Sequence, residues 1–303
     1  MTATADLNRT SHFYFHRDKI EQEIAKSILS FGEKTKLRDA CEYALKGEGK
    51  RFRPLLVLLI AEALGSGLNV LDAALSVEFF HTASLIVDDL PCMDNEEERR
   101  SRPTLHKIYG ESIALLSSYA LICAAFEKIQ TSTLKMKESG LPYHLTADQV
   151  GMIALEQATR SAGILGATGG QFYDLFPPSP TLETLRQVIY KKTVTLFEVS
   201  FVFGWLFGGG DLVRLDRVKS SAYHFGMAFQ IADDLGDLAQ DEKNQRDINL
   251  AKQVGKDRAF AIFEEELRLF KITLMELGLD TPSFKKMCDM LHQLALKNFT
   301  SLD

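Results

Sequence analysis

Carboxylates gather at two places in this sequence, and both places follow long apolar runs. The first is the stretch DDLPCMD, which begins with Asp88 and Asp89 and ends with Asp94. The second is the stretch DDLGD, from Asp233 to Asp237. An unpaired carboxylate is costly to bury, so an apolar helix that ends in adjacent aspartates needs partners for them. Hard divalent cations such as Mg²⁺ take carboxylate oxygens and usually share their coordination shell with substrate phosphates.

The spacing in the second cluster favours a shared site. On a helix, Asp233 and Asp237 lie on one face about 6 Å apart, with Asp234 beside them and Asp241 one turn further on. Like charges at this spacing destabilise a helix unless a positive group lies between them. Either cluster alone also fits a solvated surface or a helix cap. Two such clusters, each at the end of an apolar helix, favour one joint site for metal and phosphate.

The first cluster needs a break in its helix before its members can share a ligand. Asp88 and Asp94 are six residues apart, which is about 240° around an ideal helix and therefore on opposite sides. Pro91 lies between them and disrupts a regular helix. We expect a helix end or a bulge here that brings Asp94 back towards Asp88.

Basic side chains that could hold an anion occur near both clusters. They are Lys50, Arg51, Arg53, Arg99, Arg100, Lys191 and Lys192. The segment GKRFRP, residues 49–54, opens an apolar helix, and the N-terminus of a helix is favourable to anions. His81 lies about two turns before Asp88. Each basic group alone also fits a surface cluster, and His81 also fits a core histidine with satisfied hydrogen bonds.

The composition is that of an ordinary globular protein and argues against several classes. The chain has 303 residues, 46% hydrophobic and 25% charged, with a formal net charge of −6, whereas nucleic-acid sites usually carry a basic excess. The four cysteines form no CxxC pair, so neither a disulfide framework nor a zinc site is indicated. The N-terminal segment contains acidic residues that a transit peptide lacks. The most apolar run, residues 199–207, is too short to span a bilayer. We expect a cytoplasmic protein without a transmembrane segment.

Apolar residues recur with helical spacing along most of the chain, and alternating, strand-like runs are absent. The expected helices are residues 14–31, 36–46, 51–64, 69–89, 104–137, 146–166, 181–207, 212–238, 255–277 and 282–299. The segment 69–89 is apolar on almost every side, which indicates a helix at the centre of a bundle. No repeat or shift of composition divides the chain, so we expect a single all-α domain over residues 1–303.

Together these motifs resemble the trans-isoprenyl diphosphate synthases, or polyprenyl synthetase family. The matching segments, in the order that the family has them, are GKRFRP (49–54), VEFFHTASLIVDDLPCMD (77–94), RRSRPTLHK (99–107), GGQFYD (169–174), KKT (191–193) and FQIADDLGD (229–237). Two acidic motifs together with GKRFRP separate these synthases from terpene cyclases, which carry one. The wording around DDLPCMD looks most like geranylgeranyl and farnesyl diphosphate synthases.

The resemblance implies long helices around a deep apolar cavity, with the two acidic motifs facing each other at its mouth. The implied Mg²⁺ ligands are Asp88, Asp89, Asp94 and Asp233, and less directly Asp234 and Asp237. The residues implied around the allylic diphosphate are Arg99, Lys192, Thr193 and Gln230, and those implied in the isopentenyl diphosphate pocket are Lys50, Arg53, His81 and Arg100. Gln171 and Asp174 would line the site. The catalytic residues would be Asp88, Asp89, Arg99, Lys192 and Asp233.

The chemistry implied by the resemblance is chain elongation. Metal ions neutralise the charge on the leaving diphosphate, an apolar wall keeps water from the allylic cation, and isopentenyl diphosphate attacks that cation. Three places depart from the family pattern. Val87 stands where a His is usual, residues 118–119 are Ser-Tyr where Gly-Asp is common, and the lysine expected after the second motif is either Lys243 or Lys252.

The length of the product would depend on the cavity floor beneath Asp88. One helical turn rises about 5.4 Å, close to the length of one extended isoprene unit. Ser84 and Ala83, one turn before Asp88, are small, whereas farnesyl-type members often have an aromatic residue there. Phe80 and Phe79 are the first large side chains further down. We expect geranylgeranyl diphosphate as the product with Phe80 as the floor, unless these rings only pack the core.

Other functions stay open at this point. A farnesyl diphosphate synthase would use the same site with a shallower cavity. A non-catalytic partner subunit of a prenyl synthase would tend to lose acidic motifs that this chain keeps, and a terpene cyclase would not need GKRFRP. The family also leads us to expect a homodimer that binds isopentenyl and allylic diphosphates and no nucleic acid.

Overall fold

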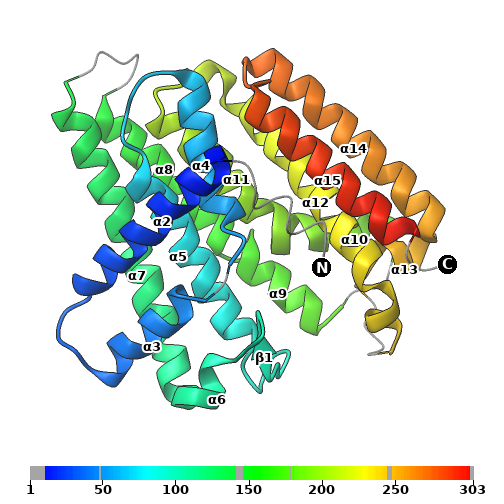
Figure 1. Ribbon diagram of the computed structural model, residues 1–303. Coiled ribbons are helices and arrows are strands. Elements are labelled where there is room, and N and C mark those ends of the chain that lie inside the picture. The colour runs from blue at the N-terminus through cyan, green and yellow to red at the C-terminus, as the bar shows by residue number, and fades with distance from the viewer. Residues whose placement is uncertain are drawn as a thin grey trace.

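The computed structural model is a bundle of long helices (Figure 1), and it describes residues 11–47, 49–140, 146–177, 179, 181–243 and 248–300. Its elements are α2 (Ser11–Leu29), α3 (Lys36–Leu45), α4 (Phe52–Leu64), α5 (Leu71–Asp88), β1 (Glu98–Arg99), β2 (Arg102–Pro103), α6 (Leu105–Tyr109), α7 (Glu111–Glu138), α8 (Ala147–Ala162), α9 (Ala167–Leu175), α10 (Leu182–Ile189), the π-helical turn η1 (Tyr190–Val194), α11 (Thr195–Phe207), the 3₁₀ turn η2 (Leu212–Arg214), α12 (Leu215–Lys243), α13 (Leu250–Val254), α14 (Lys256–Leu277) and α15 (Pro282–Thr300). The all-α prediction is confirmed. In the described residues the only strands are those of the short hairpin β1–β2.

Helix α5 lies in the middle of the bundle, as its apolar sequence indicated. It packs against α7, α4 and α11, and most of its side chains are buried. Its two buried acids are neutralised by cations from other elements, because Asp72 meets Lys128 and Lys135 while Glu78 meets Arg51. The helix therefore arrives at Asp88 with its upstream charges already paired.

The second acidic cluster lies on α12, which packs against the fully buried α11 on one side and against α14 and α15 on the other. Figure 1 shows α14 and α15 running alongside α12 at one edge of the bundle. Helix α11 also packs closely on α4, where a Cβ added at Gly204 would lie only 2.9 Å from the Val57 carbonyl oxygen. The helices α4, α5, α11 and α12 thus form the frame that positions both acidic clusters.

Several predicted helix boundaries were wrong. The expected helix 104–137 is divided at Gly110, whose φ of 84° suits glycine and ends a right-handed helix. The expected helix 181–207 is interrupted by η1, and α9 and α13 were not predicted. Two adjacent glycines weaken the helical pattern of α9, and α13 is a single short turn between capping residues.

Among the described helices, α7 alone has the length and apolar composition of a membrane span. The sequence prediction had considered only residues 199–207, the most apolar run. Those residues instead belong to the buried α11. Helix α7 packs along α5, α8, α3 and α6. Core helices of globular proteins meet the same length and composition, so α7 is weak support for a membrane span.

Candidate active site

The first acidic cluster begins at the C-terminal end of α5 and continues into a turn. The backbone N–H of Asp94 donates to the carbonyl oxygen of Asp88 at 2.9 Å, and that of Met93 donates to the Leu90 carbonyl at 2.9 Å. The turn that contains Pro91 therefore folds Asp94 back over the end of the helix. The two carboxylates are close enough for Asp94 to raise the pKa of Asp88.

The adjacent Asp88 and Asp89 have different surroundings. Asp89 is buried and its Oδ1 accepts hydrogen bonds from Nε of Arg99, at 2.9 Å, and from Nη2. Asp88 is half-buried, and among the described residues its carboxylate has no hydrogen bond or ion pair. Burial raises the pKa of Asp88 to about 6, opposed by the nearby charge of Lys192. Burial also raises the pKa of Asp89, and Arg99 opposes that rise.

The second cluster repeats this contrast in the continuous helix α12. Asp234 is buried and accepts hydrogen bonds from Gln230 Nε2 at 2.9 Å and from the backbone N–H of Leu250 at 2.8 Å. Burial nevertheless raises the pKa of Asp234 to about 7. Asp233 has no such partner among the described residues. Burial raises its pKa to about 6, while Lys50 and then Arg53 oppose the rise.

Both clusters face one cavity of about 420 Å³, which we call the acidic gap. Its polar lining residues are Asp94, Asp174, Lys192, Thr193, Gln230, Asp234, Asp237 and Asp241. Asp94 lines it from the first cluster, and Asp234, Asp237 and Asp241 line it from the second, whereas Asp88, Asp89 and Asp233 are not among its lining residues. Within the described part of the chain, no three of these aspartates bring carboxylate oxygens within 4.8 Å of one another. The carboxylates therefore surround a space instead of converging on one point.

The π-helical turn η1 presents the side chains of Lys192 and Thr193 to the acidic gap. Lys192 Nζ pairs with Asp174 of α9, and Thr193 Oγ1 donates to Gln230 Oε1 at 2.7 Å. Such turns occur often at functional sites, because the extra residue redirects neighbouring side chains. Helix α9 approaches η1 so closely that a Cβ at Gly170 would lie 2.4 Å from the backbone nitrogen of Lys192. The glycine is therefore required where it stands.

Gln171 is the member of the GGQFYD segment that the structure places differently from Asp174. It is buried, and among the described residues neither Nε2 nor Oε1 of its amide has a hydrogen-bond partner. It is not among the residues that line the acidic gap. Asp174, one turn further along α9, reaches the gap and holds Lys192.

A second cavity, of about 360 Å³, lies at the start of α4, and we call it the basic pocket. It is lined by Lys50, Arg51, Phe52, Arg53, Glu78, His81, Arg100, Ser101 and Phe229. Arg53 Nη1 lies 3.2 Å from His81 Nε2, and the guanidinium covers the ring of Phe197 at 4.4 Å. Burial, followed by the charge of Arg53, holds the pKa of His81 well below its usual value. Burial lowers the pKa of Arg53 to about 10, although the charges of Glu78 and Asp233 oppose this.

Arg51 belongs to the lining of this pocket, but protein groups occupy its guanidinium. Nε donates to Glu21 at 2.7 Å, Nη1 pairs with Glu78, and Nη2 reaches the carbonyl oxygens of Leu45 and Gly47. The Arg51 backbone is left-handed, with φ of 52°, a conformation that costs energy outside glycine. These contacts fix the loop from which Lys50 and Arg53 extend.

Arg99 and Arg100 lie on the hairpin β1–β2, and only Arg100 reaches one of the two cavities, the basic pocket. Arg99 pairs with Arg102 in the hairpin, so Arg100 and Ser101 form its two-residue turn, with φ of 56° and 59°. Arg99 therefore points to Asp89, whereas Arg100 lines the basic pocket. Gly49 leaves room for Arg100, because a Cβ there would lie 2.5 Å from its Nη1.

The residues expected at the cavity floor lie between α5 and α7. Phe80 is 5% exposed, and its ring meets Phe126 of α7 edge-to-face with 5.1 Å between centroids. The Ala83 carbonyl accepts a hydrogen bond from Ser118 at 3.1 Å, and Ser84 donates to the carbonyl oxygen of His81 at 2.9 Å. Sequence reasoning missed Phe126, which is distant along the chain and has no motif around it.

Sequence reasoning also missed Asn249, which closes the far end of the second cluster. Its amide donates to the backbone oxygen of Asp234 and to Asp241 Oδ2, both at 2.9 Å. Its position at the start of α13, where it caps Lys252 N–H at 2.9 Å, is the signal that could have revealed it. Of the two candidate lysines, Lys252 lies on α13, whereas the side chain of Lys243 lies outside what the structure describes.

Comparisons with known proteins agree with this geometry. Residues 34–260 match the model of a family described as polyprenyl synthetase. A protein of Capsicum annuum described as a chloroplastic geranylgeranyl pyrophosphate synthase is 39% identical over 225 residues, which are 73% of this chain but 57% of that protein. A geranylgeranyl diphosphate synthase of Cyanophora paradoxa is 36% identical over 256 residues, 83% of this chain and 80% of its own length. The crystal structure of a Thermotoga maritima geranyltranstransferase, 28% identical, has a TM-score of 0.75 and covers 95% of this chain and 98% of its own.

Proposed function

Because the chain belongs to the polyprenyl synthetase family, we propose that it is a trans-prenyltransferase that condenses isopentenyl diphosphate with allylic diphosphates to make geranylgeranyl diphosphate. The observation that carries the proposal is that the basic pocket lies close to the second acidic cluster. Asp233 belongs to the second acidic cluster, yet Lys50 and Arg53 of the basic pocket are the cations that act on it. Two neighbouring cavities of opposite charge suit two diphosphates, one held through metal and one held directly.

The carboxylates in and beside the acidic gap form a donor set that fits Mg²⁺. Asp88 and Asp233 are half-buried carboxylates whose charge no hydrogen bond or ion pair meets among the described residues, and Asp89 keeps Oδ2 outside its bonds to Arg99. Mg²⁺ takes one or two carboxylates and completes its shell with water and phosphate oxygens, which suits carboxylates arranged around a space. We assign Asp88, Asp89, Asp94, Asp233 and Asp237 to the metal, with Asp234 as the residue that positions the others. When bound, Mg²⁺ would neutralise the charge that develops on the leaving diphosphate.

The protein groups around the gap suit the allylic diphosphate. Arg99 donates to Asp89 through Nε and Nη2, which leaves Nη1 for a phosphate oxygen. Lys192 is held by Asp174 and lies close enough to Asp88 to lower its pKa. Thr193 and Gln230 are joined by a hydrogen bond at the same wall. In this assignment Gln171 supports α9 against η1, and Asp174 orients Lys192.

The basic pocket suits isopentenyl diphosphate, which keeps its diphosphate during the reaction and so needs no metal to help it leave. Lys50, Arg53 and Arg100 supply the positive charge. His81, whose pKa is lowered by burial and by these arginines, is neutral at pH 7 and offers hydrogen bonds without adding charge. The ring of Phe229 lines the same pocket and would shield the reacting carbon from water.

For the chain length we propose that the floor is a pair of rings, Phe80 and Phe126, with Ala83 and Ser84 leaving the turn above them open. Truncating either ring would then lengthen the product, and Ala83→Phe would shorten it towards the farnesyl product. Product sizing with geranyl and farnesyl diphosphate as substrates tests this. Unchanged product length in Phe80→Ala, Phe126→Ala and Ala83→Phe would show that these rings only pack the core.

Among the alternatives, farnesyl diphosphate synthase differs only in this floor and is decided by the same assay. A non-catalytic subunit is disfavoured because each acidic cluster keeps a carboxylate that no described residue pairs with, Asp88 in the first and Asp233 in the second. A terpene cyclase is disfavoured because the basic pocket adds a second anion site that such a reaction does not use.

We further propose a homodimer that buries the exposed apolar side chains of α7 and α8. These are Leu115, Leu116, Tyr119, Leu134, Met152 and Leu155. An apolar surface of this kind, in a soluble protein, marks an interaction site, and sedimentation or light scattering would test the stoichiometry. A cytoplasmic location stays a prediction from the sequence, since the Capsicum annuum relative is described as chloroplastic.

The decisive experiment incubates the purified protein with labelled isopentenyl diphosphate, an allylic diphosphate and Mg²⁺, followed by product sizing. We expect label in geranylgeranyl diphosphate and none after chelation of Mg²⁺. If a folded protein transfers no label to longer prenyl chains, the synthase assignment fails.

A further inference from the structure

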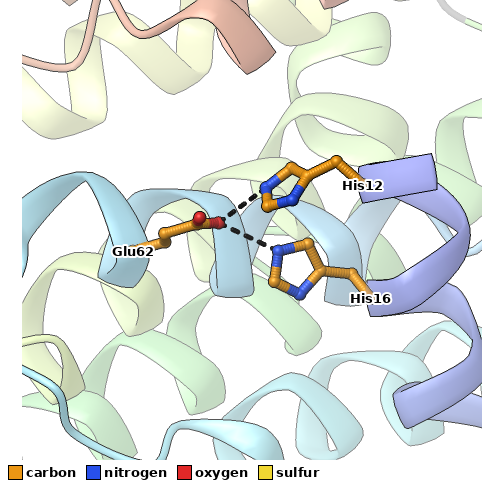
Figure 2. Close-up of side chains that lie close together, drawn as sticks. All are labelled: His12, His16 and Glu62. Atoms are coloured by element: carbon orange, nitrogen blue, oxygen red, sulfur yellow. Dashed lines mark hydrogen bonds and ion pairs between the residues drawn. The ribbon is translucent and has the colours of Figure 1, made fainter. Parts of the chain in front are cut away.

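A histidine pair and a glutamate come together where α2 crosses the last turn of α4. His12 and His16 are four residues apart on α2, so both rings project from one face of the helix. Oε2 of Glu62 lies 3.0 Å from Nε2 of His12 and 2.9 Å from Nε2 of His16. Figure 2 shows both rings turned towards this one carboxylate. Within the described part of the chain, this is the group whose three possible ligand atoms all lie within 4.8 Å of one another.

We propose that His12, His16 and Glu62 bind a divalent transition-metal ion of the zinc class. Two imidazole nitrogens and one carboxylate oxygen form a ligand set that Zn²⁺ and neighbouring first-row ions accept. A tetrahedral ion about 2.05 Å from each ligand atom holds those atoms about 3.3 Å apart. The present distances from Glu62 need to open by only a few tenths of an ångström, which ordinary rotations of its side chain permit.

The site is accessible from solvent on one side and supported by the protein on the other. The side chains of His12 and Glu62 are 42% and 49% exposed, whereas that of His16 is 10% exposed. An ion can therefore enter without unfolding the bundle, and water can fill the fourth coordination position. The site resembles an open coordination sphere and not a closed structural one.

The second coordination shell sets the expected strength of binding. A ligating histidine usually donates its other ring N–H to a protein acceptor, and loss of that bond weakens metal binding about 10–100-fold. Nδ1 of His16 is buried and has no hydrogen-bond partner among the described residues. We therefore expect a dissociation constant in the micromolar range, weaker than that of a structural zinc site.

This site differs in chemistry from the acidic gap. Mg²⁺ prefers oxygen ligands and retains several waters, so a pair of imidazoles selects against it, whereas the gap offers carboxylates. The bound ion would join α2 to the C-terminal end of α4. Helix α2 already carries Glu21, which accepts a hydrogen bond from Arg51 at 2.7 Å just before α4 begins. The metal would thus add a second attachment of α2 to the helix that supports the basic pocket.

The test uses the full chain, freed of metal with a chelator and kept at pH 7.5 in excess MgCl₂ so that the acidic gap is occupied. Calorimetric titration with ZnCl₂ alone is expected to show one site per chain that Mg²⁺ does not compete for, and thermal unfolding is expected to shift upwards by several degrees. Co²⁺ in its place reports nitrogen ligands by its visible absorption. His12→Ala and Glu62→Gln should each weaken binding at least about 10-fold.

The matched control is His292→Ala on α15. The His292 side chain is 41% exposed and its Nε2 lies 4.0 Å from Glu264. The substitution therefore removes an equally accessible histidine beside a glutamate. This variant should bind Zn²⁺ as the unaltered chain does. Because the side chains of His12 and Glu62 are about half exposed, the unfolding temperatures of their variants should be close to that of the unaltered chain without metal. Absence of Zn²⁺ binding, equal binding by His12→Ala, loss in the control, or displacement by Mg²⁺ would each overturn the proposal.

Discussion

The acidic gap and the basic pocket are built from neighbouring side chains of the same type that differ in their partners. In the two acidic clusters beside the gap, Asp89 is held by Arg99 and Asp234 by hydrogen bonds from α12 and the start of α13. Their neighbours Asp88 and Asp233 have no such bonds among the described residues, and burial raises the pKa of each to about 6. One member of each pair supports the structure, and the other presents a charge that a ligand must meet.

The basic pocket shows the same division with the opposite charge. Arg51 is held by Glu21, Glu78 and two carbonyl oxygens, whereas Nε of Arg53 is buried without a partner among the described residues. The difference between the two regions lies in what completes them. The gap needs cations before it can accept a diphosphate, and the pocket can accept one directly. In the proposed reaction only the allylic diphosphate leaves, so only that side needs metal.

The largest effect is expected at Asp88 and Asp233, whose carboxylates have no partner among the described residues. Asp88→Asn and Asp233→Asn should each lower the rate of prenyl transfer at least about 1,000-fold, near 4 kcal/mol. Each removes a proposed ligand of the Mg²⁺ that would neutralise the charge on the leaving diphosphate. Each change also removes a crowded, half-buried carboxylate, so the unfolding temperature should stay equal or rise. Steady-state assays and thermal unfolding of the metal-free variants measure both. A large loss of stability would mean that these residues are anchors like Asp89.

A large effect on folding, and not on chemistry, is expected at Arg51. Arg51→Met leaves the buried carboxylate of Glu78 unpaired, which should cost about 3 kcal/mol of unfolding free energy. Arg53→Met is the matched control, since among the described residues Arg53 forms no ion pair with a carboxylate. That variant should keep its stability and raise the KM for isopentenyl diphosphate. Urea unfolding of both variants decides the matter, and equal destabilisation would erase the distinction between the two arginines.

The sequence predicted where the two acidic clusters lie, but it did not predict which aspartate of each cluster is held by hydrogen bonds. The second cluster was predictable because α12 is continuous, so the four-residue spacing of Asp233 and Asp237 placed them on one face. For the first cluster, Pro91 indicated that Asp94 would fold back. The anchoring contacts were not predicted, because two of them come from other elements: Arg99 lies on the β1–β2 hairpin and the Leu250 N–H on α13.

The interrupted helix at Lys192 was missed for a related reason. The segment YKKTV contains no glycine or proline, so local signals favour a continuous helix there. The π-helical turn forms where η1 packs on α9 and α12, and Gly170 permits that contact. Tertiary packing decided the conformation, as it did for the edge-to-face contact of Phe126 with Phe80.

A smaller loss of stability is expected at the anchored member of the second pair. Asp234→Asn replaces an oxygen that accepts from the Leu250 N–H or from Gln230 with an amide N–H₂, which leaves one buried donor unmet. The cost should be about 1–2 kcal/mol, seen as a lower urea midpoint. Asp289→Asn, at an exposed position of α15, is the control and should leave the midpoint almost unchanged. If Asp234→Asn were as stable as the control, the hydrogen bond from Leu250 to Asp234 would not anchor the start of α13.

The smallest effect concerns the pH dependence contributed by His81. Its folded pKa lies well below the ordinary value of 6.5 because of burial and then Arg53. Below pH 6.5 the unfolded chain therefore binds a proton that the folded chain refuses, so this group lowers stability as pH falls and contributes nothing above pH 7.5. The slope is at most about 1.4 kcal/mol per pH unit for one proton. His81→Gln should flatten the decline of the urea midpoint between pH 6.5 and 5.5, whereas His292→Gln, on the exposed side of α15, should not.

Inorganic diphosphate sharpens this last test, because burial is the main cause of the low pKa of His81 and the positive charge of Arg53 and Arg100, which the proposed ligand would offset, adds to it. An anion bound beside Arg53 and Arg100 should raise the pKa of His81 and reduce the decline in the unaltered chain. In His81→Gln the same addition should stabilise the protein about equally at pH 6.5 and 5.5. With Mg²⁺ withheld, the acidic gap repels the anion, so the response reports the basic pocket alone. If diphosphate stabilises the metal-free chain yet leaves the difference between the two proteins unchanged, the anion binds away from His81, and the two cavities do not differ in the way that their charges indicate.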